Sequence, residues 1–140
     1  MKKGKLEETL GYALAKSQRK FYHHLRRELV QYNLTPPQFG VLVLLWEQDG
    51  LSQVEVGNIL EVDRTTLTGI IDRLEKSGLV ARKPDPDDRR SKLVYLTQAG
   101  REYEELVIPV AEKINHSFSE KFSPQELEQL LGYLKRMIEE

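Results

Sequence analysis

The sequence has no cysteine among its 140 residues, and this absence excludes several kinds of chemistry. Without a thiol the chain can form no disulfide, no thiolate metal site and no thiol-based redox switch. It also has no apolar run near the ~20 residues needed to span a bilayer, and its start, MKKGKLEET, lacks the apolar stretch of a signal peptide. We therefore expect a cytoplasmic protein with no membrane partner.

A net charge of one sign is missing as well, since 21 Lys/Arg oppose 22 Asp/Glu. The charges are unevenly placed: residues 63–92 hold eight Lys/Arg and six Asp/Glu, whereas the rest of the chain holds 13 and 16. Phosphate contacts depend on where cations lie rather than on their total, so this segment can still meet nucleic acid. The length fits one domain with its own core.

Residues 79–100 have the pattern of a β-hairpin with a basic tip. We expect strands over Leu79–Lys83 and Lys92–Thr97, because the prolines and aspartates of Pro84–Asp88 favour turns and resist strand structure. The cations of this hairpin are Arg82, Lys83, Arg89, Arg90 and Lys92. Upstream, residues 52–77 predict two short helices joined by a tight turn. Together they predict a winged helix-turn-helix that offers one helix and one basic loop to DNA.

Apolar residues at three- or four-residue spacing predict helices on both sides of this unit. One long amphipathic helix is expected over residues 6–33, and a helix that is apolar on nearly all sides should form the buried centre from Thr35 to about Gln48. After the hairpin, Thr97 opens a helix interrupted by Pro109, and a last helix covers residues 124–139. Capping boxes, in which a Ser or Thr N-cap precedes Gln or Glu by three residues, mark three helix starts: Thr35–Gln38, Ser52–Glu55 and Ser123–Glu126.

The second helix of the helix-turn-helix is expected over Asp63–Ser77, with Asp63 as its N-cap. Its apolar face consists of Leu67, Ile70, Ile71 and Leu74. Its polar side begins with short side chains next to an arginine: Arg64, Thr65, Thr66 and Thr68. Threonine methyls can meet thymine, threonine hydroxyls can reach base edges or phosphates, and arginine can pair with guanine, so we expect this end of the helix to enter a major groove.

Several motifs, in the right order, resemble the MarR family of bacterial and archaeal transcriptional regulators. They are Leu34-Thr35-Pro36-Pro37-Gln38-Phe39, Val62-Asp63-Arg64-Thr65-Thr66-Leu67-Thr68, Asp72-Arg73-Leu74-Glu75, Asp88-x-Arg90 and Leu96-Thr97-x-x-Gly100. The resemblance implies a mostly α fold, a winged helix-turn-helix with a two-stranded β wing and long N- and C-terminal dimerisation helices. It implies a single domain over 1–140, with a DNA-binding lobe at 34–97 and a dimerisation region at 1–33 and 98–140.

The resemblance also implies roles for the wing. Arg90 would enter the minor groove, and Asp88 would hold its guanidinium by a bidentate pair. Arg89 and Lys92 would add phosphate contacts, and Arg73 and Lys83 would contact phosphate rather than read sequence.

Small aromatic or anionic ligands of the family bind between the dimerisation helices and the DNA-binding lobe. Tyr12, Arg19, Phe39 and Trp46 are the corresponding candidates here, although core packing alone would account for each aromatic residue. The lack of cysteine separates this chain from the peroxide-sensing branch of the family. Glu61 stands where family members often have glycine, so it must accept the backbone angles of the turn.

Metal and enzyme chemistry find little support. Glu112 and His116, at i and i+4, would form half a metal site as in the zinc-sensing relatives, but such pairs are usually surface residues, and we expect no metal or cofactor. His23, His24 and His116 are accompanied by no cysteine, nucleophile elbow or phosphate-binding glycine loop, so we expect no enzyme.

We therefore expect a sequence-specific transcriptional regulator, acting as a repressor, that binds a pseudo-palindromic operator in double-stranded DNA as a homodimer. A small aromatic or anionic effector would release it. Two alternatives stay open: a ligand- or metal-binding helical sensor, and a winged-helix module for protein contacts without DNA binding.

Overall fold

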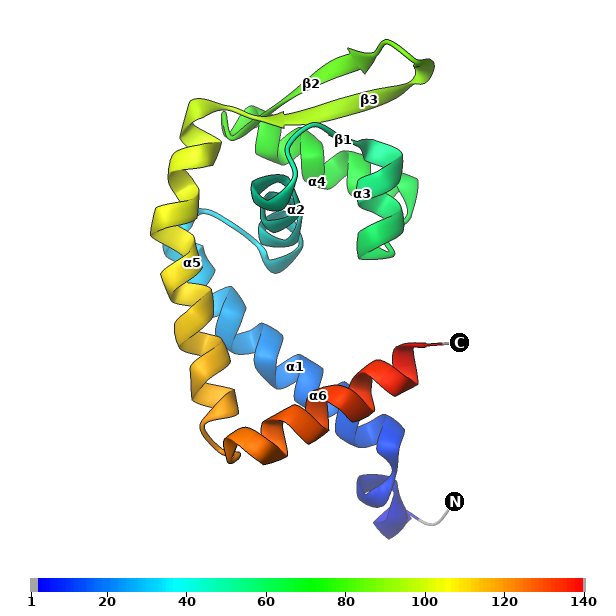
Figure 1. Cartoon of the computed structure of the whole chain (residues 1–140), viewed down its shortest axis with the longest axis vertical. Helices are drawn as coiled ribbons and strands as arrows, with labels where there is room; N and C mark the ends of the chain where they lie inside the picture. Colours follow the sequence, from blue (N-terminus) through cyan, green and yellow to red (C-terminus); the bar gives the residue numbers. More distant parts are fainter. Residues whose placement is uncertain (1–2, 140) are drawn as a thin grey trace.

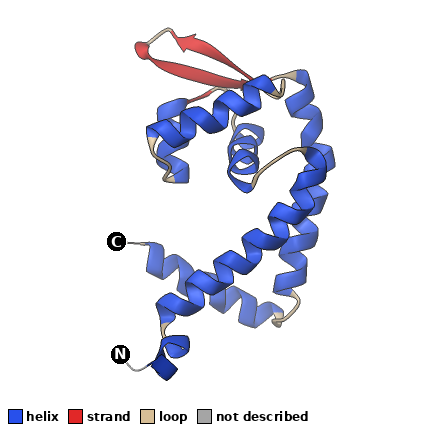
Figure 2. Cartoon of the chain, turned by 180° about the vertical axis from the view of Figure 1, so that it is seen from behind, coloured by secondary structure: helices blue, strands red, loops and turns tan. Residues whose placement is uncertain are grey.

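The computed structural model describes residues 3–139, and its elements fall into two parts (Figure 1). In chain order they are η1 (Lys3–Glu8), α1 (Leu10–Leu29), η2 (Val30–Tyr32), α2 (Pro36–Glu47), β1 (Leu51–Ser52), α3 (Gln53–Leu60), α4 (Arg64–Lys76), β2 (Val80–Asp85), β3 (Asp88–Leu96), α5 (Gln98–Ser119) and α6 (Pro124–Ile138). The mostly helical chain with a projecting hairpin is also seen from behind (Figure 2). Met1, Lys2 and Glu140, which the predicted domain includes, lie outside the described residues.

The predicted helix over residues 6–33 is divided, which corrects the expectation of one continuous helix. A 3₁₀ segment ends at Glu8, Thr9 is extended (φ −83°, ψ 146°), and its side chain accepts a 3.3 Å hydrogen bond from the Tyr12 N–H as the N-cap of α1. Threonine offers the backbone this alternative to helical bonding, so the helix restarts there. The predicted end near Asn33 is confirmed, because Asn33 adopts the left-handed conformation (φ 58°).

The helix α2 begins as predicted and lies at the centre of the lobe. Thr35 Oγ1 accepts from the Gln38 N–H at 3.3 Å, and Gln38 Oε1 accepts from the Thr35 N–H at 2.9 Å, which completes the capping box. Its residues Phe39, Val41, Leu42 and Leu45 are buried. Val43, Leu44 and Trp46 are partly buried and pack against the same core, so the prediction of a central buried helix is confirmed.

The helix-turn-helix is present, with one local correction. Ser52 Oγ accepts from the Glu55 N–H at 3.1 Å, but Glu55 does not bond back to the Ser52 backbone, so this box is only half formed. Ser52 is also the last residue of β1, paired with Leu93, and its backbone serves the sheet. Glu61 does take the left-handed angles of the turn (φ 54°), and a Cβ on Gly57 would lie 3.3 Å from the Val62 carbonyl oxygen.

The wing strands extend further than predicted. The sheet has the order β1-β3-β2, with both pairs antiparallel, so the expected two-stranded wing gains a short third strand. Pro84 pairs with Lys92 and Asp85 pairs with Asp88, whereas turn structure was expected over the whole of Pro84–Asp88. Proline is tolerated here because β2 is an edge strand, and an irregularity between Pro84 and Asp85 adjusts the register.

The helix after the wing is continuous, so the predicted interruption is wrong. The α-helix α5 runs from Gln98 through Pro109 to Ser119 (Figure 1). A proline removes one hydrogen bond without ending a helix that packing holds on either side, and Val107 and Ile114 are both buried. The predicted capping box of α6 is confirmed, with Glu126 and Ser123 bonded in both directions.

One core joins the two parts, but the outer helices keep apolar surface exposed. Leu29 of α1, Leu42 of α2, Ile71 of α4, Val94 of β3 and Val107 of α5 are fully buried. In contrast, α6 buries none of its residues within this chain. Exposed apolar residues of η1, α1, α5 and α6 include Leu6, Leu10, Leu14, Leu106, Leu131, Tyr133, Met137 and Ile138. Among residues 3–139, no helix has the length and apolar character needed to cross a membrane.

Candidate nucleic-acid interface

The first turn of α4 presents its polar side chains to solvent while its apolar face is buried. Leu67, Ile70, Ile71 and Leu74 are the buried residues, as predicted. Asp63 is the N-cap: one carboxylate oxygen accepts from the Thr66 N–H and the other from the Thr66 hydroxyl, both at 2.8 Å. These hydrogen bonds hold the pKa of the Asp63 carboxyl below its ordinary value of 3.8. The Asp63 cap therefore fixes the backbone at the start of α4, which carries Arg64 and Thr65.

The three threonines of this turn are not equivalent. The Thr66 hydroxyl is occupied by Asp63, and the Thr68 hydroxyl donates to the Arg64 carbonyl oxygen at 2.9 Å. Thr65 is exposed, and its side chain makes no hydrogen bond within the described residues. Thr65 is thus the threonine whose hydroxyl is free for an outside partner, whereas Thr66 presents mainly its methyl group.

In the wing, the predicted ion pair between Asp88 and Arg90 is absent. The Asp88 carboxylate instead accepts a 3.0 Å hydrogen bond from the backbone N–H of Arg90. Aspartate readily bonds the backbone two residues on, and this competes with pairing to a side chain. Arg89, Arg90 and Lys92 are all exposed. These three cations of the wing therefore face solvent, on a backbone that Asp88 holds in place.

A cavity of ≈ 520 Å³ lies between α3, α4 and the wing and collects half of the predicted DNA-binding residues. Those that line it are Arg64, Thr68, Asp88, Arg90 and Lys92. Gln53, Asn58 and Ser91 also line it, and sequence reasoning missed all three. The Ser91 hydroxyl is buried and has no hydrogen-bond partner among residues 3–139. Only the alternation along β3 could have indicated that Ser91 faces inward.

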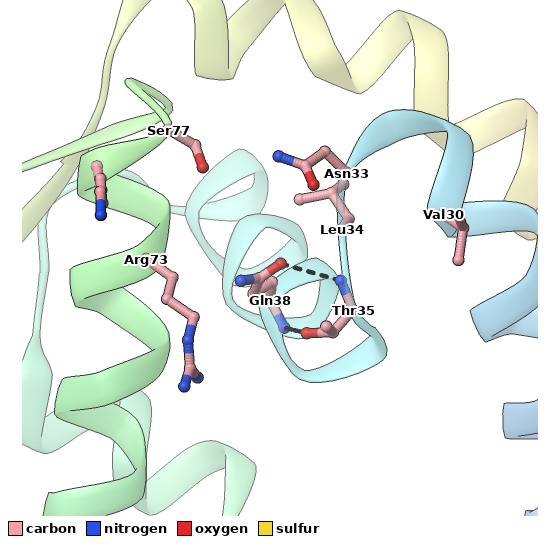
Figure 3. Close-up of a pocket in the computed structure, with 8 residues that line it drawn as sticks. Val30, Asn33, Leu34, Thr35, Gln38, Arg73 and Ser77 are labelled. Carbon is pink, nitrogen blue, oxygen red and sulfur yellow. Dashed lines mark hydrogen bonds between the residues drawn. The ribbon is translucent and has the colours of Figure 1, made fainter.

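Arg73 and Lys83, the predicted phosphate contacts, lie elsewhere. Arg73 lines a second cavity of ≈ 400 Å³ beside the Thr35–Gln38 capping box (Figure 3). Lys83 is exposed on β2, with Nζ 5.0 Å from the centre of the Tyr95 ring. Neither residue lines the cavity between α4 and the wing.

Comparison with known proteins identifies this arrangement. A family model described as MarR family matches residues 34–92. The chain is 34% identical over 135 residues to the organic hydroperoxide resistance transcriptional regulator of Bacillus subtilis, covering 96% of this chain and 90% of that protein. The chain belongs to the MarR family.

Two solved structures are similar to this chain over nearly their whole length. One is Bordetella bronchiseptica BpsR, described in terms of the regulation of its DNA binding by 6-hydroxynicotinic acid, with 32% identity, a TM-score of 0.89 and 96% of each chain covered. The other is the transcriptional repressor CouR bound to a 23-mer DNA duplex, with 31% identity, a TM-score of 0.89 and 99% of each chain covered. The predicted MarR fold and the regulator class are thereby confirmed.

The predicted effector residues of this MarR-family chain are not gathered in one place. Phe39 and Trp46 form an edge-on aromatic pair with ring centres 6.1 Å apart, and Trp46 Nε1 donates to the Gly100 carbonyl oxygen at 2.9 Å. Tyr12 lies in the first turn of α1, at the end remote from α2, and Arg19 is exposed near the middle of α1 (Figure 1). None of the four lines either of the two cavities.

The histidines do not form a metal centre within residues 3–139. His116 Nε2 lies 3.6 Å from a carboxylate oxygen of Glu120, a different partner from the Glu112 considered from the sequence. His23 and His24 are neighbours with ring centres 6.0 Å apart. No group of three or more metal-ligating side chains is present in the described part of the chain.

Proposed function

We propose that this MarR-family protein is a repressor that binds a pseudo-palindromic operator as a homodimer. The observation that carries the proposal is the single cavity between α4 and the wing, where cations from both elements, Arg64 and Arg90, lie on one surface. A helix start and a basic hairpin placed together can contact a major groove and the adjoining minor groove of one duplex. The CouR structure, which is bound to a DNA duplex, supports this reading.

In the proposed complex, the residues of α4 and the wing have separate tasks. Arg64, Thr65 and Thr68 meet base edges in the major groove, with the Thr66 methyl beside them. Arg90 enters the minor groove, and Asp88 orders the backbone that carries it. Arg89, Lys92, Lys83 and Arg73 contact phosphates. The first group determines which sequence is bound, whereas the last group contributes affinity for any sequence.

We propose that the operator is symmetric because two copies associate through the outer helices. Residues 1–33 and 98–140 would form the dimerisation region, and residues 34–97 the DNA-binding lobe. The exposed apolar residues of α1 and α6, such as Leu10, Leu131 and Ile138, support this division, because surfaces of this kind usually mark an interface. In a two-fold dimer the two α4 helices can meet successive major grooves about 34 Å apart.

We further propose that a small aromatic or anionic compound releases the operator. BpsR, whose DNA binding is described as regulated by 6-hydroxynicotinic acid, supports an effector of this class. Phe39 and Trp46 supply an aromatic pair on α2, and Tyr12 and Arg19 are the remaining candidates. Release needs only a difference in the affinity of the compound for the DNA-competent and DNA-incompetent dimers. We propose a regulator without catalytic activity that acts on DNA in the cytoplasm.

Selection of binding sites from random duplex DNA tests the proposal. We expect enrichment of an inverted repeat whose half-sites lie about 10 base pairs apart, and an affinity that falls steeply as salt rises. Failure to enrich any sequence, together with weak salt dependence, would reject DNA regulation. If the protein enriches no DNA but phenolic or carboxylate compounds quench the fluorescence of Trp46, the single tryptophan, the result favours a ligand sensor.

A further inference from the structure

Arg82 connects the wing to the recognition helix through several polar contacts. Its guanidinium Nη2 pairs with Asp72 of α4 and, at 3.0 Å, with one carboxylate oxygen of Glu75. The second carboxylate oxygen of Glu75 accepts from the backbone N–H of Arg82 at 3.1 Å. Within residues 3–139, every hydrogen bond and ion pair between the β2–β3 hairpin and α4 is made by Arg82.

Gln53 extends these contacts to α3. Its amide oxygen accepts from Arg82 Nη1, and its amide nitrogen donates to the Thr68 hydroxyl, both at 3.5 Å. Contacts of this length lie at the limit of a hydrogen bond, so they add little stability. Arg82 and Gln53 thus join the wing, α4 and α3 around the cavity that holds Arg64 and Arg90.

Arg82 is placed to contact the carboxylates of α4 rather than to add positive charge to the DNA-facing surface. Only 21% of the Arg82 side chain is exposed, so this cation is directed at α4 rather than at solvent. Asp72 and Glu75 are 54% and 41% exposed beside the polar face of α4, where a carboxylate repels DNA phosphate. The Arg82 hydrogen bonds lower the pKa of Glu75, and the hydrogen bonds to Glu75 and then to Asp72 raise the pKa of Arg82.

We propose that Arg82, Asp72 and Glu75 are positioning residues that hold the wing at the angle from which Arg90 and the start of α4 reach DNA at the same time. The inference rests on the proposed operator binding. Without these contacts the hairpin keeps its pairing with β1 and its buried Val80 and Val94, but within residues 3–139 no hydrogen bond or ion pair would tie it to α4. Its far end projects away from the helices (Figure 1). Arg89, Arg90 and Lys92 at its end would then have to be ordered during binding, which lowers affinity.

Neutralising Asp72 is a test for which simple electrostatics and the positioning role predict opposite changes in DNA affinity. Asp72→Asn takes a negative charge away from the protein near DNA, so electrostatics alone predicts tighter binding. The positioning role predicts binding about tenfold weaker per dimer, because the paired guanidinium loses a charged partner. Asp87→Asn is the matched control: it removes the same charge at the wing tip, where the Asp87 side chain bonds to no group in the described part of the chain, and it should bind slightly more tightly.

Arg82→Lys provides a second test at constant net charge. An ammonium group cannot reproduce the planar fork that spans two carboxylates, so we expect weaker operator binding with the parent's salt dependence. Hydroxyl-radical footprints of each variant should show reduced protection by the wing in the minor groove, while protection around the major-groove contacts persists. Thermal unfolding midpoints, measured alongside, report how far each change affects the fold itself.

The possible results separate the inference from the function on which it rests. A parent protein that enriches no DNA sequence overturns operator binding. A parent that binds, with Asp72→Asn as tight as Asp87→Asn or Arg82→Lys equal to the parent, overturns the positioning role. If a variant is less stable, its footprint on DNA at saturating protein is the deciding measurement. Equal loss of the protections due to the wing and to α4 contradicts the inference. Selective loss of the protection due to the wing supports it.

Discussion

Asp88 holds the backbone of Arg90 and leaves the guanidinium free: the carboxylate accepts a hydrogen bond from the Arg90 N–H at 3.0 Å. The arrangement shapes the start of β3, directly after the two-residue tip of the wing. An acidic residue beside an arginine would otherwise weaken the attraction of that arginine for phosphate. Because the bond is to the backbone, an amide side chain can replace the carboxylate.

Substitutions at these two positions should therefore follow a defined order. Arg90→Ala should weaken operator binding by about 1–3 kcal/mol per subunit and reduce the salt slope. Asp88→Ala should have a smaller effect, through a looser wing backbone, and Asp88→Asn should bind like the parent because its amide oxygen still accepts the bond. Titrations across a salt series measure this. A loss for Asp88→Asn as large as that for Asp88→Ala would contradict the backbone role.

The threonines of α4 should separate sequence reading from helix capping. Thr65→Ala should change the preferred operator sequence with little effect on stability, since its hydroxyl has no partner in the described chain. Thr66→Ala should lower the free energy of unfolding by about 1 kcal/mol, because the Asp63 cap loses one of its two hydrogen bonds to Thr66. Parallel selections on randomised DNA and urea unfolding measure both effects. An unchanged preferred motif for Thr65→Ala would remove Thr65 from the base readers.

Gly100 should be intolerant of any side chain. A Cβ at this position would lie 2.1 Å from the Leu79 carbonyl oxygen, so the start of α5 or the hairpin must shift. We expect Gly100→Ala to destabilise the fold by about 3 kcal/mol. Gly69→Ala is the control, because a Cβ on this α4 residue meets nothing within 4 Å, and it should stabilise by about 0.5–1 kcal/mol. Urea unfolding of both variants at the same protein concentration measures these effects. The same unfolding midpoint for Gly100→Ala and Gly69→Ala would contradict this packing.

The Glu75–Arg82 contact should make stability depend on pH in the acidic range. The hydrogen bonds from Arg82 lower the folded-state pKa of Glu75 below its ordinary value of 4.5. Its contribution is therefore present above that value and is lost as the pH falls through the lower folded-state pKa. We expect Glu75→Gln to be less stable than the parent near neutral pH, with the difference closing below 4.5. Unfolding curves of the parent and of Glu75→Gln, measured at decreasing pH, test this linkage. A stability difference that stays constant below pH 4.5 would exclude it.

The exposed apolar residues of α6 should mediate self-association. Leu131 is 50% exposed on a helix that buries no residue in this chain, and Leu131→Lys should shift the protein toward monomer. Ile59→Lys, at a residue 55% exposed in α3, should leave association unchanged. Analytical ultracentrifugation at micromolar concentration distinguishes the two variants. A parent that sediments only as a 16.3 kDa species would refute the dimer and the symmetric operator together.

The sequence by itself determined the features that depend on neighbours along the chain. The capping boxes at Thr35 and Ser123, the Asp63 cap and the buried face of α4 all follow from spacings of three or four residues, which the helix geometry makes contacts wherever the helix lies. The order of the MarR motifs likewise needs no coordinates. These features sufficed to predict the winged-helix fold and most of the basic surface.

Only the tertiary structure decided how separate segments meet. Trp46 and Gly100, 54 residues apart, share a hydrogen bond, and Pro84 stays in a strand because β2 is at the edge of the sheet. Arg82, which the sequence presents as one more wing cation, becomes the partner of two carboxylates once β2 packs across α4. Local preference cannot specify such pairs, because they depend on the angle between elements, and that angle is set by the packing of the whole core.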